Sequence, residues 1–225
     1  MAEAIVLSAD ELRVLGVLIE KSLCTPQYYP LTLNALVTGC NQKSNREPVV
    51  EMVEDEIDEI LIGLQGRQMA SQVFGAGSRA GKWRQELTSM LELDGPMMAV
   101  LAELFLRGPQ TLGELRTRAS RMKPIADLAM LEGVLALLAA HSPRLAMRLT
   151  PPGVRRGVRW CHCMQSEALL SQIKLAEESG VDASPAGSAP RPKSTARIDQ
   201  LEAEIEALKK RVGSLEENLG VTPTA

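Results

Sequence analysis

Residues 8–22 of the chain, SADELRVLGVLIEKS, combine a helix start signal with the apolar spacing of an amphipathic helix. Ser8 stands three residues before Glu11, the spacing of a capping box in which each side chain satisfies a backbone N–H of the other residue. Leu12, Leu15 and Ile19 follow at intervals of three and four, so they share one helical face. This stretch predicts a first helix, and the order of the elements after it decides the fold.

Two further helices and a hairpin are predicted next. Pro26 and Pro30 end the first helix, because each removes a backbone donor and restricts the residue before it. Helical spacing resumes in residues 31–41 and in residues 54–68. Residues 69–74 and 82–87 flank a glycine-rich turn within GSRAGKWRQ, residues 77–85, and predict the two strands of a hairpin. Three helices and a hairpin are the order of a winged-helix domain.

The same order recurs in the second part of the chain. Residues 95–108, 110–122 and 124–141 predict three helices, with Pro124 near the first turn of the last one. Residues 144–164 predict a hairpin whose tip carries Pro151, Pro152 and Gly153. The predicted fold class is therefore mainly α with small β-hairpins (α+β), in two tandem winged-helix domains, residues 1–94 and 95–164.

Two stretches carry a family resemblance. They are TPQYYPLTLNALVTGCNQKSNREPVV, residues 25–50, and LRGPQTLGELRTRASRM, residues 106–122. The chain resembles, over residues 7 to about 164, the YceH-like family of bacterial tandem winged-helix proteins, which has no established biochemical role. The resemblance implies this fold and a regulatory or DNA-associated setting, and it implies no catalytic residue.

The two predicted domains differ in charge. Residues 1–94 contain 8 Lys and Arg against 14 Asp and Glu, a net charge of −6. Residues 95–164 contain 10 against 4, a net charge of +6. The second domain is therefore the one expected to attract a polyanion such as DNA.

Several functional classes find no support in the sequence. No N-terminal segment has the basic, apolar and small-residue order of a signal peptide, and no apolar run reaches the roughly 20 residues that cross a membrane, so we expect a cytoplasmic protein without a membrane partner. Cys161 and Cys163 share one face of a predicted strand and His162 the other, so no metal site is predicted. Because the sequence contains neither a GxxxxGK motif nor a nucleophile with a base at a recognisable spacing, we predict no cofactor and no enzymatic activity.

The predicted DNA contacts of the first domain lie in the turn NQKSNRE rather than in its third helix. That helix is acidic from Glu54 to Glu59, and its carboxylates would repel a duplex. Carboxylates in the first turn also interact favourably with the positive end of the helix dipole. Lys43, Asn45 and Arg46 are the candidates in the turn, although Asn and Ser between helices also serve as helix caps.

The second domain supplies the larger set of candidate DNA contacts. They lie on or just after its second helix and in its hairpin: Arg116, Arg118, Arg121, Lys123, Arg155, Arg156 and Arg159. Such cations give salt-dependent, weakly specific binding when they neutralise phosphates. An alternative of equal weight is that these cations do not bind DNA. They would then form a solvated face or contact the acidic first domain of the same or a neighbouring chain.

The tail combines a linker with a heptad pattern. Residues 165–196 are expected to be a helix end and a disordered linker rich in Ser, Pro, Ala and Gly. Residues 197–219 repeat apolar side chains at alternating spacings of three and four: Ile198, Leu201, Ile205, Leu208, Val212, Leu215 and Leu219. This pattern predicts a parallel coiled-coil homodimer, with a helix that folds back on the domains as the alternative.

Two functions are compatible with these observations. One is a DNA-associated or transcriptional regulatory factor that uses the basic surface of the second domain. The other is a protein adaptor that uses winged-helix domains as interaction modules and does not bind DNA. The acidic third helix of the first domain favours the adaptor, and the basic residues in both predicted hairpins favour DNA.

Overall fold

The first predicted helix, α1 (Ala9–Cys24), begins at Ser8 through the predicted capping box. Glu11 N donates to Ser8 Oγ at 3.1 Å, and Ser8 N donates to Glu11 Oε2 at 2.7 Å. In this computed structural model, residues 4–74, 81–151, 153–154, 156–178 and 211 are described. Residues 1–185 form one unit, and a second unit, residues 186–225, contains the single described residue Arg211.

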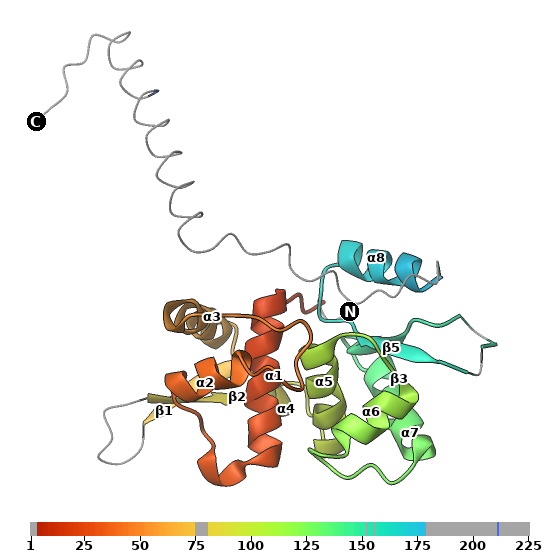
Figure 1. Ribbon diagram of the computed structural model, residues 1–225, viewed down its shortest axis with the longest axis horizontal. Coiled ribbons are helices and arrows are strands. Elements are labelled where there is room, and N and C mark those ends of the chain that lie inside the picture. Colours follow the sequence, from red (N-terminus) through yellow and green to blue (C-terminus); the bar gives the residue numbers. More distant parts are fainter. Residues whose placement is uncertain (1–3, 75–80, 152, 155, 179–210, 212–225) are drawn as a thin grey trace, which may run out of the picture. The chain divides into compact units, whose positions relative to one another are not determined.

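The first half of the first unit, residues 4–93, continues in the predicted order (Figure 1). A 3-10 helix, η1 (Pro26–Tyr28), follows α1, and Thr32 caps α2 (Leu33–Cys40). The acidic helix α3 (Glu54–Gly66) then leads into an antiparallel hairpin. The last elements of this half are β1 (Ala70–Phe74), β2 (Gly81–Gln85) and a short helix, α4 (Leu87–Met90).

The second half, residues 95–164, repeats this order. It contains α5 (Gly95–Arg107), β3 (Gln110–Thr111), α6 (Leu112–Ala119), α7 (Leu128–Ala140), β4 (Ala146–Arg148) and β5 (Arg159–His162). The helix predicted from residue 124 begins later, at Leu128, because the Asp127 side chain accepts from Met130 N and makes residue 127 the N-cap. A further helix, α8 (Glu167–Glu178), follows this half.

The two halves place their strands in the same way. In the first half, Leu31 precedes the cap of α2 and forms an isolated antiparallel bridge with Trp83 of β2. In the second half, Gln110 precedes the cap of α6 and pairs with Trp160 of β5. Strand β5 is central in a sheet of order β3-β5-β4. Within the described residues the fold is therefore a mixed one of eight α-helices with small antiparallel sheets.

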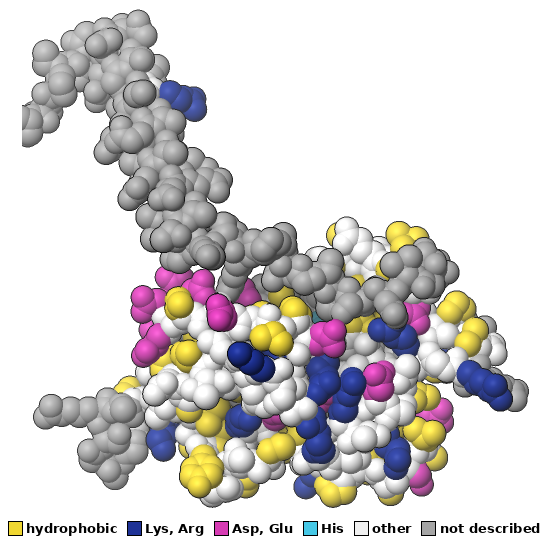
Figure 2. Space-filling view, viewed as in Figure 1, with side chains coloured by type: hydrophobic (Ala, Val, Ile, Leu, Met, Phe, Trp, Pro, Cys, Tyr) yellow, Lys and Arg dark blue, Asp and Glu magenta, His cyan; other side chains and the backbone are white. Residues whose placement is uncertain are grey.

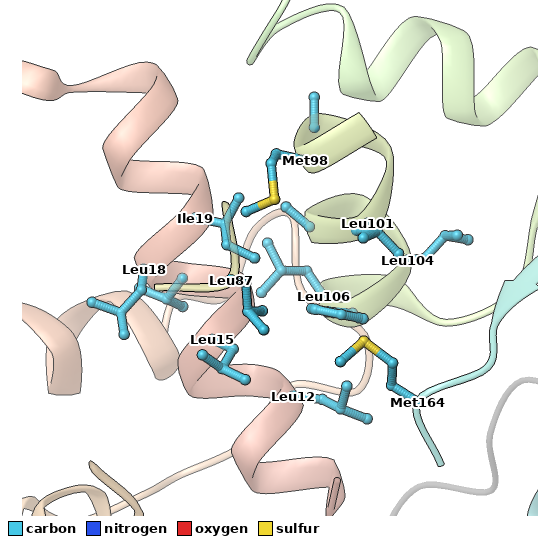
Figure 3. Packing of buried hydrophobic residues seen from close by; sticks show 14 of the residues in the cluster. Leu12, Leu15, Leu18, Ile19, Leu87, Met98, Leu101, Leu104, Leu106 and Met164 are labelled. Atoms are coloured by element: carbon cyan, nitrogen blue, oxygen red, sulfur yellow. The ribbon is translucent and has the colours of Figure 1, made fainter. Parts of the chain in front are cut away.

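Helices α1 and α5 form the centre of the fold. Every residue from Leu12 to Glu20 and from Met98 to Leu106 is buried. Figure 3 shows leucines of α1, among them Leu12, Leu15 and Leu18, packed in one cluster with Leu101, Leu104 and Leu106 of α5. A Cβ atom on Gly16 would lie 2.9 Å from Leu106 Cδ2, so the absence of a side chain there permits the close approach. One hydrophobic core therefore spans both halves, and the predicted domain boundary between residues 94 and 95 stays a prediction.

Candidate nucleic-acid interface

The cations of the second half begin on α6, which a second capping box positions. Glu114 N donates to Thr111 Oγ1 at 3.3 Å, and Thr111 N donates to Glu114 Oε2 at 2.9 Å. Leu115 and Ala119 are fully buried and orient the helix. Arg116 and Arg118 therefore stand on its outer side, and the turn after α6 contributes Arg121 and Lys123.

Two of these four cations are paired with carboxylates of the protein itself. The Arg118 guanidinium lies 3.2 Å from Glu114 Oε1 and donates to Gln110 Oε1 at 2.6 Å. Arg121 Nη2 lies 3.7 Å from Glu103 Oε2, although the Arg121 side chain is 46% exposed.

The other two have no carboxylate partner among the described residues. Arg116 Nη1 donates to the Ala126 carbonyl oxygen at 3.3 Å. Lys123 is exposed, and its stem lies over Gly95 at the start of α5. Within this group, Arg116 and Lys123 are thus the cations whose charge no described carboxylate neutralises.

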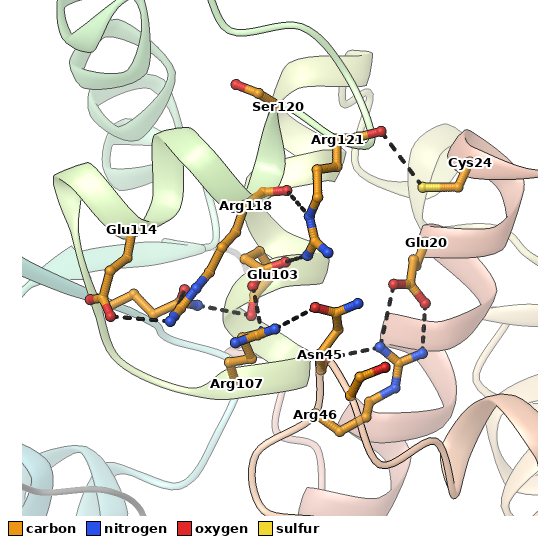
Figure 4. Close-up of polar contacts among 12 residues, drawn as sticks. Glu20, Cys24, Asn45, Arg46, Glu103, Arg107, Glu114, Arg118, Ser120 and Arg121 are labelled. Atoms are coloured by element: carbon orange, nitrogen blue, oxygen red, sulfur yellow. Dashed lines mark hydrogen bonds and ion pairs between the residues drawn. The ribbon is translucent and has the colours of Figure 1, made fainter.

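Figure 4 shows where the paired arginines lie, in a contact that we call the seam. The seam joins α1 and the 41–48 loop of the first half to α5 and α6 of the second half. Glu103 is 1% exposed, and its Oε1 lies 2.9 Å from Arg107 Nε. Burial raises the pKa of Glu103, and the nearby charges of Arg107 and Arg121 offset that rise only in part. Arg107 Nη2 also donates to Asn45 Oδ1 at 2.6 Å, which links the two halves.

Arg46 lies in the interior of the protein. Asn45 has a φ of 59°, a left-handed conformation that Asn tolerates, and the chain then turns Arg46 inward. The Arg46 side chain is 0% exposed, with Nη2 at 2.6 Å from Glu20 Oε2 and Nε donating to the Gly39 carbonyl at 3.1 Å. Burial alone would raise the pKa of Glu20, but the hydrogen bonds and charge of Arg46 leave it lowered. Of the three candidates in this loop, only Lys43 is exposed.

The cations of the second hairpin are likewise divided. Arg156 is exposed, and Arg155 lies outside the described residues. Arg159 Nη1 lies 3.1 Å from Glu177 Oε2, and its Nη2 donates to the Pro109 carbonyl at 3.2 Å. Glu177 belongs to α8, whose Ile173 packs in a small separate cluster with Leu149 and Cys161.

The sequence analysis did not predict that Arg159 pairs with a residue of α8. Residues 165–196 were expected to hold only a helix end before the linker, yet α8 has 12 residues. The spacing of Leu170, Ile173 and Glu177 after Ser166, whose side chain accepts from Leu169 N, is the signal that identifies this helix.

The surface charge of the two halves differs as the sequence predicts. Figure 2 shows acidic side chains gathered over α3 and Lys and Arg side chains over the region of α5 and α6. On α3, Glu54, Asp55 and Glu59 are exposed. Glu56 Oε2 accepts from Val53 N at 3.2 Å, the interaction with the helix start that was expected for this acidic run.

Two further features bear on the site. Among the described residues, no group of three or more His, Cys, Asp or Glu side chains could hold a metal ion. None of the described helices is long and apolar enough to span a membrane. The predicted dimer residues, from Ile198 to Leu219, lie outside the described part of the chain.

The comparisons with known proteins place the chain in a family. Residues 7–154 match a family described as "Protein of unknown function, DUF480". A UPF0502 protein of Geobacter sulfurreducens is 52% identical over 167 residues, which is 74% of this chain and 76% of the relative. UPF0502 proteins of Pelobacter propionicus and Chromobacterium violaceum are 44% and 38% identical and cover 93% and 95% of this chain, and 93% and 92% of their own lengths. The chain therefore belongs to the uncharacterised bacterial family DUF480, with UPF0502 proteins as relatives, in agreement with its YceH-like resemblance.

Proposed function

We propose that this chain is a non-enzymatic, DNA-associated regulatory protein that contacts duplex phosphates through the second half. One observation carries the proposal: Lys123 and Arg156 are exposed, Arg116 is partly exposed, and none of the three has a carboxylate partner among the described residues. We call these three residues the basic surface. The exposed acids of α3, by contrast, belong to the first half. The cytoplasm is the proposed setting.

The proposal includes two tandem winged-helix domains. Its support is the repeated order of three helices and a hairpin, together with the matching strand pairs Leu31 with Trp83 and Gln110 with Trp160. In each case the paired residue, in an isolated bridge at Leu31 and in β3 at Gln110, precedes a Thr-capped second helix and pairs with the last strand of the half.

The proposed contact is with phosphates rather than with base edges. Winged-helix and related modules commonly read bases with a helix in the major groove. Here the third helix of the first half, α3, exposes carboxylates, and that of the second half, α7, exposes Glu132 as its one charged side chain between Leu128 and Ala140. Phosphate contacts position a protein on a duplex without selecting a sequence, so weak specificity follows.

Fluorescence anisotropy with a labelled duplex tests the proposal. The variant Arg116→Ala, Lys123→Ala, Arg156→Ala should bind at least roughly tenfold more weakly than the wild type near physiological salt, because three cations no longer neutralise phosphates. The matched control removes three cations of the first hairpin, Arg79→Ala, Lys82→Ala and Arg84→Ala, and should bind nearly as well as the wild type. Absence of binding by the wild type, or equal reductions in both variants, would contradict the proposal.

A second candidate function, a protein adaptor, is favoured by the apolar outer face of α7, where Leu128 and Leu137 are 47% and 56% exposed. Recovery of partners from native lysate, with and without nuclease, separates the two functions. Partners that survive nuclease treatment support the adaptor, and partners that disappear support DNA association.

We further propose that the tail forms the homodimer. The heptad pattern from Ile198 to Leu219 is its support. Deletion of residues 190–225 should halve the mass measured by light scattering without changing the circular dichroism melting temperature of the remaining protein. An unchanged mass would place the dimer contact elsewhere or show that the chain is a monomer.

A further inference from the structure

Helix α7 is apolar on both of its faces. Leu131, Val134, Leu135 and Leu138 are buried and fix its inner side. A surface helix of a soluble protein ordinarily turns charged and polar side chains outward. The outward side of α7 instead carries small and apolar residues with one acid: Leu128, Ala129, Met130, Glu132, Gly133, Ala136, Leu137 and Ala140.

The outer face of α7 combines large apolar side chains with open space. Leu128, Met130 and Leu137 are 47%, 38% and 56% exposed. A Cβ atom on Gly133 would meet nothing within 4 Å. The 13 residues of α7 present about 20 Å of this surface, at a rise of about 1.5 Å per residue. Small residues between the larger ones permit the close interaxial distance, roughly 8 to 10 Å, at which two helices pack.

The charges beside this face are mainly positive. At the start of α7, the Arg116 guanidinium donates to the carbonyl oxygen of Ala126, and Lys123 is exposed in the preceding turn. Arg144 is exposed just after its end. Of the acids nearby, Asp94 and Asp127 have side chains that cap α5 and α7, which leaves Glu132 on the face and Glu92 beside the residue that contacts His141. Cations at both ends of an apolar face complement a partner that is apolar in the middle and acidic at its flanks.

We propose that the outer face of α7 docks an amphipathic helix of another protein, one that presents small and medium apolar side chains along its contact face and Asp or Glu at its flanks. The mode is that of a helix packed on a helix, with the apolar stripe buried and the flanking acids near Arg116, Lys123 and Arg144. This inference rests on the second candidate function and specifies its partner.

Three other kinds of partner fit the outer face of α7 less well. DNA would place phosphates and base edges against alanine and leucine, which provide no hydrogen-bond donors. A lipid surface favours Trp, Phe or many Leu side chains, whereas this face has only three large apolar ones. The α3 helix of a second copy carries Asp55 and Glu59 in the centre of its outward side, so docking would bury both carboxylates against apolar groups.

The test uses the full-length protein and two synthetic 18-residue helical peptides as probes. Both peptides carry the same stripe of Leu and Ala, with Glu at the flanks of one and Lys at the flanks of the other. Anisotropy titrations should show roughly tenfold tighter binding of the Glu peptide, a difference of about 1.4 kcal/mol. Equal affinities, or no binding of either peptide, would overturn the proposal.

Substitutions locate the site. Leu137→Glu and, independently, Ala136→Glu should each weaken binding of the Glu peptide by at least roughly tenfold. Each substitution places a charge of the same sign as the peptide's flanks in the apolar stripe. The matched control, Leu175→Glu, changes a leucine of α8 that is 62% exposed and should leave affinity unchanged. Circular dichroism melting of each variant confirms folding. Unchanged binding by both α7 variants would overturn the proposed site.

Two further measurements distinguish the other occupants. A fall in sedimentation mass caused by Leu137→Glu without peptide would assign the face to a second copy. Leu137-dependent binding to anionic phospholipid vesicles would assign it to a membrane, and either result would overturn the proposal. Duplex DNA binding should be the same in Leu137→Glu and in the wild type, so failure of this inference and failure of the DNA proposal remain distinguishable.

Discussion

In the seam, Arg46 and Arg107 donate their hydrogen bonds to Glu20 and Asn45, whereas Arg116 and Lys123 on the outside of the second half have no carboxylate partner among the described residues. Arg107 thus joins the two halves and Arg46 holds the 41–48 loop on α1, whereas Arg116 and Lys123 stay available to a ligand. A count of positive charges does not separate these roles. Only the position of each side chain in the fold does.

Glycine shows the same contrast. Gly16 of α1 faces Leu106 of α5, where a Cβ atom would lie 2.9 Å from two of its side-chain atoms. Gly133 of α7 faces open space. The first glycine permits helix packing inside the protein, and the second leaves a surface open to a partner.

The largest expected effect concerns the buried ion pair of the seam. Arg46→Ala leaves Glu20 buried without its partner and should lower the free energy of unfolding by about 3–5 kcal/mol. Arg116→Ala, on the outside, should change it by less than about 0.5 kcal/mol. Urea denaturation of both variants provides the measurement. A loss of stability below about 1 kcal/mol for Arg46→Ala would show that this buried ion pair contributes little to stability.

The two glycines should respond to alanine with opposite signs. Gly16→Ala forces Leu106 and its neighbours to shift and should cost about 1–3 kcal/mol. Gly133→Ala adds a helix-favouring residue without a clash and should stabilise the protein by about 0.5–1 kcal/mol. Thermal and urea unfolding of both variants check the difference. Stabilisation by Gly16→Ala would contradict the close α1–α5 packing.

The pH dependence of stability should separate the two buried carboxyls. The pKa of Glu20 is lowered in the fold, so its contribution is present above the ordinary value of 4.5 and is lost as the pH falls through the lowered pKa. The pKa of Glu103 is raised, so its contribution is present below 4.5 and is lost as the pH rises through the raised pKa.

Urea denaturation between about pH 3 and pH 7 measures both effects. Glu20→Gln should reduce the loss of stability on the acid side. Glu103→Gln should remove a gain that appears as the pH falls toward 4.5. The same pH profile in both variants would contradict the opposite shifts.

The smallest expected effect concerns Arg159, a cation of the second hairpin that α8 engages. Glu177→Gln removes the carboxylate at 3.1 Å from Arg159 and should raise the affinity for duplex DNA by roughly twofold to threefold, because one negative charge beside this cation no longer repels a phosphate. Glu167→Gln at the other end of α8 is the control and should have less effect. Lower affinity of Glu177→Gln would indicate that Glu177 orients Arg159 for binding.

Local sequence signals predicted the helices and hairpins well. Ser8 with Glu11 and Thr111 with Glu114 show why, since each capping pair lies within three residues of sequence. The predicted start of α7, at Pro124, was too early, because Asp127 is the N-cap and the helix begins at Leu128. The seam could not be predicted, because Arg46 and Glu20 are 26 residues apart, and Asn45 and Arg107 are 62 apart. The predicted contact residues stay a prediction, and the partners that several of them have within the fold were not predicted.

The salt dependence of DNA binding tests the central claim, that the available cations are those outside the seam. Log affinity for a labelled duplex, plotted against log salt, should have a slope shallower by about two to three units when Arg116, Lys123 and Arg156 are changed to Ala, because each phosphate that is no longer neutralised reduces the slope by about 0.9. The slope should stay nearly unchanged when Arg79, Lys82 and Arg84 are changed. Equal slopes for the wild type and both variants would contradict the account.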